Sequence, residues 1–128
     1  MKNLLTILTV LLLSQSLMSQ LSLDLEKSKI KWTGKKITNA SHWGSLSFSE
    51  ANLDFDGDDL VGGKFIVDMN SMSVDDIQGR GKQRLEGHLR NEDFFDVENH
   101  KEAILLFNER VPLNTGVYEV KGTLTIKG

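Results

Sequence analysis

The stretch that decides the fold is residues 45–70, which have the sequence SLSFSEANLDFDGDDLVGGKFIVDMN. Apolar residues take every second position in three parts of it, beginning with Leu46 and Phe48 between serines. Such alternation is typical of a strand with one buried face. Two sequences that favour turns separate the parts, because glycine adopts positive φ at low cost: Asp56-Gly57-Asp58-Asp59 and Gly62-Gly63. The stretch therefore predicts consecutive antiparallel strands.

The same period of two continues on both sides of this stretch. Ile30 and Trp32 alternate with polar residues before it, and residues 103–107 form an apolar run after it that we expect to be covered on both faces. A turn at Asn114-Thr115-Gly116 precedes the last segment, which Gly122 interrupts as a bulge would. About six strands without helices between them predict an antiparallel barrel or sandwich.

One segment breaks the alternation. Ser73-Val74-Asp75-Asp76 has a capping serine followed by acids, which is typical of a helix start. Leu85 and Leu89 are four residues apart, but three glycines weaken a continuous helix. We expect one or two short helical turns between Ser73 and Asn91.

The N-terminus predicts export. Lys2 precedes an apolar run over residues 4–13, and small and polar residues follow it. This run is much shorter than the roughly 20 residues that a membrane-spanning helix needs, so it predicts a signal peptide over residues 1–19, cleaved near Ser19, rather than stable membrane insertion. Residues 20–128 then form one domain, which we expect to be periplasmic or secreted.

Charge and cysteine content exclude several classes. Residues 20–128 hold 14 basic and 18 acidic residues, a net charge of −4. Nucleic acids and anionic lipid surfaces attract a concentrated cationic face, so we do not expect them as partners. The absence of cysteine excludes disulfides and thiolate metal ligands.

Catalytic and metal-binding motifs are also not found in the sequence. His42, His88 and His100 lack the close spacing of a helical metal motif, and no serine lies in a Gly-x-Ser-x-Gly elbow. The acids between residues 54 and 59 indicate a solvated hairpin more than a calcium loop. We therefore predict no metal, no cofactor and no catalytic residue, with an unrecognised enzyme as the less favoured alternative.

Phe94 and Phe95 are too large to be exposed without a reason. They either plug one end of the core or line a binding cavity. The alternating apolar residues of all strands point to one interior, and a barrel of about eight strands either fills that interior or leaves room for one ligand. The expected interior residues are Ile30, Trp32, Leu46, Phe48, Leu53, Phe55, Phe65, Val67, Met69, Tyr118, Val120, Leu124 and Ile126.

Several runs of residues resemble the YceI-like family. The strongest is HLRNEDFFDVE over residues 88–98, in which Asn91 replaces a common serine. Weaker matches are KIKWTGKK at residues 29–36, HWG at 42–44, GGKFIVDM at 62–69 and GTLTIKG at 122–128. The resemblance covers residues 21–128.

This resemblance implies an exported protein with a lipocalin-like antiparallel β-barrel that holds an isoprenoid-type lipid, such as a quinone or a polyprenyl lipid. His42 and His88 would lie at the cavity mouth. The alternative is an interaction or stress-related protein with a filled core. The expected cavity-lining residues are Trp32, Phe48, Phe65, Met69, Phe94, Phe95 and Tyr118.

Domains of this family continue beyond the segment that resembles residues 122–128. We therefore expect an incomplete barrel, with the strands near Ile30 and Ile126 as open edges. The chain would then be a fragment, or a homodimer would form by pairing of these edges.

Overall fold

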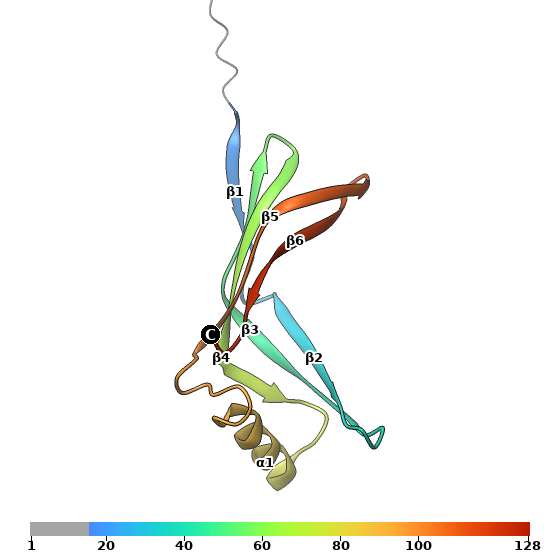
Figure 1. The fold of residues 1–128 in the computed structure, drawn as a ribbon, viewed down its shortest axis with the longest axis vertical. Coiled ribbons are helices and arrows are strands. Elements are labelled where there is room, and N and C mark those ends of the chain that lie inside the picture. Colours follow the sequence, from blue (N-terminus) through green and yellow to red (C-terminus); the bar gives the residue numbers. More distant parts are fainter. Residues whose placement is uncertain (1–15) are drawn as a thin grey trace, which may run out of the picture.

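The computed structural model describes residues 16–128 and consists of one sheet with one helix at its end. The order along the chain is β1 (Met18–Ser22), β2 (Lys29–Lys35), β3 (Ser41–Asp56), β4 (Asp59–Val74), α1 (Gly79–Arg90), β5 (Glu102–Asn114) and β6 (Val117–Thr125). All pairs of strands are antiparallel. The six strands form an open sheet (Figure 1), which confirms the all-β class and the incomplete barrel.

β3 is the central strand of this sheet. One side of it pairs with β2 over residues 41–47 and with β1 over residues 52–56, and its other side pairs with β4. β5 and β6 follow β4, so β6 forms one edge and β1 and β2 form the other. The predicted pairing of these edges between two copies stays a prediction.

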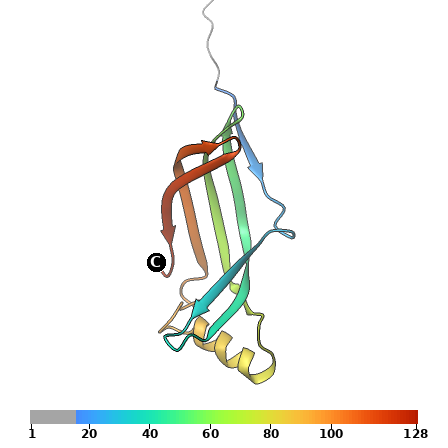
Figure 2. The ribbon, with the colours of Figure 1, turned by 90° about the vertical axis from the view of Figure 1, so that its right-hand side faces the viewer.

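The sheet curves into a trough. β2 and β6 both lie to the right of β3 and β4 in Figure 1. In Figure 2, seen from that side, β6 lies at the left margin and β2 crosses obliquely in front of the lower part of the sheet. α1 lies at one end of the trough, and the β3–β4 hairpin lies at the other (Figure 2).

A large bulge in β4 bends the sheet beside α1. Ser47 pairs with Asp68 and Ser45 pairs with Ser73, so residues 69–72 lie opposite a single residue of β3. The Ser71 hydroxyl fills part of the gap, because its Oγ accepts the Ser47 N–H at 2.8 Å and donates to the Asp68 carbonyl at 2.6 Å. Bulges bend a strand and redirect its side chains, and here both Met69 and Met72 are buried.

The core lies where α1 and the following loop meet the bent end of the sheet. Trp32, Leu46, Leu85 and Phe95 pack around it. Its buried residues are Met69, Met72, Val74, Leu89, Val97 and Ala103.

The helix differs from its prediction in length and start. Ser73 does not cap it, since Ser73 belongs to β4 and its hydroxyl donates to the Asp75 carboxylate at 2.7 Å. α1 begins at Gly79 and has 12 residues, and Gln78 makes no side-chain cap. Each glycine costs about 1 kcal/mol in a helix interior, but packing of Leu85 and Leu89 against the core compensates for it.

The prediction of a turn at Gly62-Gly63 is wrong, because both glycines lie inside β4. Gly63 pairs with Phe107, and a Cβ atom on Gly63 would lie 2.3 Å from the Phe107 ring. The turn at Asp56–Asp59 is confirmed, with Gly57 at φ +60°.

Two further predictions have different outcomes. Residues 103–107 are covered on one face only, because no other described element packs on the outer face, where Leu106 is 50% exposed.

The predicted signal peptide falls mostly on residues 1–15, outside the described residues, and the predicted cleavage point near Ser19 lies within β1.

Candidate ligand-binding site

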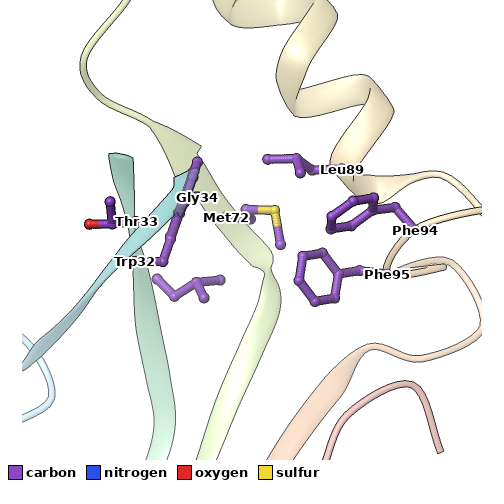
Figure 3. A pocket seen from close by; sticks show the side chains of 8 residues that line it. Trp32, Thr33, Gly34, Met72, Leu89, Phe94 and Phe95 are labelled. Atoms are coloured by element: carbon purple, nitrogen blue, oxygen red, sulfur yellow. The ribbon is translucent and has the colours of Figure 1, made fainter. Parts of the chain in front are cut away.

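An apolar cavity lies between α1 and the sheet; we name it the helix-end cavity. Its volume is about 220 Å³. Figure 3 shows Trp32 entering from β2, Leu89 from α1, and Phe94 and Phe95 from the loop after the helix, with Met72 between them. The lining residues are Trp32, Thr33, Gly34, Leu46, Met72, Leu89, Phe94 and Phe95.

Trp32 is held in this cavity by a glycine on the neighbouring strand. Trp32 pairs with Gly44, and its Nε1 donates to the Ser73 carbonyl at 3.2 Å. A Cβ atom on Gly44 would lie 2.7 Å from Trp32 Cζ2 and 1.8 Å from Ser73 O. Only glycine at this position leaves room for both the indole and β4.

The loop after α1 positions the two phenylalanines. The Phe95 N–H donates to the Leu89 carbonyl at 3.1 Å and the Val97 N–H to the Arg90 carbonyl at 3.0 Å, which folds the loop back onto the helix end. Asp96 adopts φ +46°, and its carboxylate accepts the Asn99 side chain at 3.0 Å. The Phe94 and Phe95 rings pack edge to face, with their centroids 4.9 Å apart. Aromatic pairs prefer this orientation.

A second apolar hollow lies on the concave face of the sheet; we name it the trough. Its volume is about 330 Å³, and six apolar residues line it: Ile30, Phe48, Phe65, Val67, Leu105 and Leu124. Ile30 in the trough pairs with Leu46 in the helix-end cavity. Directly paired residues share a face of the sheet, so the two hollows follow one apolar surface.

A polar hollow lies beyond the helix-end cavity, between α1 and the β2–β3 hairpin; we name it the basic hollow. Its volume is about 290 Å³, and its lining residues are Lys36, His42, Ile77, Gly81, Arg84, Leu85 and His88. An intermediate hollow joins the two, because it shares Trp32, Leu89 and Phe94 with the helix-end cavity and Lys36, His42 and His88 with the basic hollow.

Asp76 orients His42 at this end. His42 Nδ1 lies 2.8 Å from Asp76 Oδ2, and Asp76 Oδ1 accepts the Trp43 N–H at 3.2 Å. Partial burial acts to raise the pKa of the Asp76 carboxyl, but hydrogen bonds from His42 and from the Trp43 N–H outweigh it, so this pKa lies below its ordinary value. The ionised carboxylate only accepts hydrogen bonds, so Nδ1 carries the proton and Nε2 is left for other partners.

Most residues predicted to line a cavity do so in the structure. Trp32, Phe94 and Phe95 meet in the helix-end cavity, and Phe48 and Phe65 meet in the trough with ring centroids 5.7 Å apart. The predicted mouth residues His42 and His88 share the basic hollow.

Two predicted residues lie elsewhere. Met69 lines none of these hollows, because it is covered within the buried core, where it is only 4% exposed. Tyr118 lies on β6 near Arg110, and the centroid of its ring is 5.8 Å from the guanidinium carbon of Arg110.

Several lining residues could not be predicted from the sequence. Met72 lies in the bulge, which no local pattern indicates, and Leu105 belongs to an apolar run for which the sequence predicts no single buried face. Leu89 was recognised only by its spacing from Leu85. Lys36 and Arg84 are 48 positions apart in the sequence. Both have the sequence context of exposed residues, so nothing in the sequence predicts that they lie close together.

The structure also bears on metal binding and on membrane crossing. Among residues 16–128, no three histidines, cysteines or acids are close enough together to hold a metal ion. In the same part of the chain, the single helix lacks the length and the apolar character that crossing a bilayer requires.

Comparison with known proteins gives one finding about family. Residues 21–128 match the family model described as YceI-like domain. This range includes every residue of the three hollows. No curated protein matches the chain.

Proposed function

Because the chain belongs to the YceI-like domain family, we propose that it is an exported binding protein that holds an apolar, isoprenoid-type lipid on the concave face of its sheet. The lipid chain follows the trough into the helix-end cavity. The protein acts as a carrier or store for a quinone or polyprenyl lipid and catalyses no reaction on it.

The continuous apolar lining is the observation that carries this proposal. All six residues that line the trough are apolar. Large apolar side chains remain open in both hollows, with Leu124 60% exposed in the trough and Phe94 45% exposed in the helix-end cavity. Contiguous apolar surface of this kind marks an interaction site. An isoprenoid chain offers no hydrogen bonds, so its affinity would come from buried apolar area at about 25 cal/mol per Å².

Analysis of co-purified lipid tests the proposal. The full chain is purified from a bacterial host, and an organic extract is analysed by mass spectrometry. We expect an isoprenoid lipid at a reproducible molar ratio. Repeatedly empty extracts, together with no binding of added isoprenoids, would instead favour the interaction or stress-related protein.

A matched pair of variants locates the lipid. Leu124→Glu places a charge in the trough, whereas Thr123→Glu places the same charge on the opposite face of the same strand. Both positions are exposed, so neither change should unfold the protein. We expect Leu124→Glu to lose the lipid and Thr123→Glu to retain it, and equal retention would contradict binding in the trough.

Export is a separate part of the proposal and has its own test. Residues 1–19 would direct the chain across the membrane and be removed near Ser19. The intact mass of the protein recovered from its native host should lack these residues. Recovery with Met1 still present would contradict cleavage.

A further inference from the structure

We propose that the basic hollow binds an anionic head group, a phosphate ester, on the lipid whose chain occupies the helix-end cavity. Lys36 and Arg84 supply the charge, and His42 and His88 supply further hydrogen-bonding groups. This inference rests on the proposed function and deepens it, since it selects phosphorylated polyprenyl lipids over neutral quinones.

The helix places cationic and apolar side chains side by side. Gly81, Arg84, Leu85 and His88 all line the basic hollow, and their spacing puts them on one face of α1. Leu89, one residue after His88, lines the helix-end cavity. A ligand that follows this helix face therefore passes from an apolar to a cationic environment.

The cations of the basic hollow have no partners among residues 16–128. Neither Lys36 nor Arg84 forms an ion pair there. Two other cations of the helix are engaged: Lys82 lies 3.6 Å from Glu86, and Arg90 donates to the Met72 carbonyl. The hollow is lined by no acid, so a bound anion would meet two uncompensated charges.

The helix α1 carries an excess of positive charge in a chain that is negative overall. The chain has a net charge of −3, yet α1 holds Arg80, Lys82, Arg84 and Arg90 against the single acid Glu86. Four of the acids lie at the opposite end of the trough, around the β3–β4 turn at residues 54–59. Acids also lie beside α1, because Asp75 and Asp76 precede it and four more occupy residues 92–98. The anion site therefore depends on the side chains that line the basic hollow and not on the overall charge of this end.

A rival polar site lies towards that opposite end and is less suitable. Arg110 and Tyr118 are near each other on β5 and β6, but Arg110 Nη2 lies 3.6 Å from Asp59 Oδ2. Its charge is therefore already compensated. In the basic hollow, His42 also leaves Nε2 for a ligand, because Asp76 engages Nδ1.

The test compares two ligands with the same tail. Binding of farnesyl phosphate and of farnesol to the full chain is followed by quenching of tryptophan fluorescence, since Trp32 lines the cavity. Charge-assisted hydrogen bonds contribute about 1.5–3 kcal/mol, so we expect farnesyl phosphate to bind at least about tenfold more tightly. In the variant K36Q/R84Q this difference should disappear while farnesol binding is unchanged.

Arg80→Gln is the matched control, because Arg80 is an exposed cation of the same helix that does not line the hollow. It should preserve the preference for farnesyl phosphate. An equal loss in this control would overturn the site in favour of general charge attraction. Equal affinity of the unaltered chain for both ligands would overturn the head-group site and leave the lipid-binding function intact, whereas failure of both ligands to bind would contradict that function itself.

Discussion

Replacing Gly44 with alanine should both destabilise the fold and disturb the cavity. The backbone at Gly44 does not have positive φ, so alanine is acceptable in conformation and only space decides the outcome. The new Cβ would lie 1.8 Å from the Ser73 carbonyl oxygen and 2.7 Å from Trp32 Cζ2. Nonbonded carbon atoms are in contact at about 3.5–4.0 Å, so the indole must move by about 1 Å and β4 must move further.

The expected cost follows from which atoms must move. The oxygen belongs to the backbone, and Gly44 pairs with Val74 in the ladder between β3 and β4, so relief of the clash opens that ladder. Overpacking costs about 1–3 kcal/mol and sometimes more. Loss of the hydrogen bond from Trp32 to Ser73 adds about 1 kcal/mol. We therefore expect Gly44→Ala to lower the free energy of unfolding by about 3 kcal/mol.

Gly34→Ala is the matched control for this change. Gly34 lies beside the same indole, but a Cβ there would meet only Trp32 Cζ3 at 3.8 Å, an ordinary contact. We expect a change within about 0.5 kcal/mol. Urea unfolding followed by circular dichroism measures both variants, and lipid retention is measured in parallel. Similar stabilities for the two variants would refute the reasoning.

Three further predictions follow from the geometry. Gly63→Ala places a Cβ 2.3 Å from the Phe107 ring, so it should lower the free energy of unfolding by about 2 kcal/mol. In urea unfolding this loss should be smaller when Phe107 is replaced by leucine. Additive losses in the double variant would contradict this contact. The pKa of Asp76 is lowered in the folded state, so its stabilising effect is present above the unfolded pKa of about 3.9 and is lost as pH falls through the folded pKa. The difference in urea midpoint between the unaltered chain and Asp76→Asn should therefore shrink below about pH 4, and a difference independent of pH would refute it. Phe94→Ala removes a ring that is 45% exposed, so it should cost less than the roughly 3–5 kcal/mol of a buried phenylalanine and yet reduce lipid retention; retention equal to that of the unaltered chain would exclude Phe94 from the site.

Alternation in the sequence was enough to predict the strands and most of their faces. Phe48 and Phe65 belong to different strands and were assigned to one interior from the period of two alone, and both line the trough. Gly57 marked the central turn correctly, because its positive φ is a local property.

Features that depend on strand pairing could not be predicted in this way. The bulge at residues 69–72 brings Met72 into the core beside Met69, and only the register between β3 and β4 reveals it. The pair Gly62-Gly63 is typical of a turn, but Gly63 lies within β4 and is covered by the Phe107 ring of β5. The proximity of Lys36 and Arg84 likewise depends on where α1 lies against the β2–β3 hairpin.

The order of strands in the sheet has a consequence for how the chain folds. β2 with β3, β3 with β4, and β5 with β6 are each neighbours along the chain as well as in the sheet. Among the strands of residues 16–128, only β1 pairs across an intervening strand of the sequence, since it pairs with β3 and not with β2. Because local pairings cost little loop-closure entropy, we expect the β3–β4 hairpin to form in the folding transition state and β1 to dock late. Substitutions at Gly57 should then slow folding, whereas substitutions in β1 should mainly accelerate unfolding.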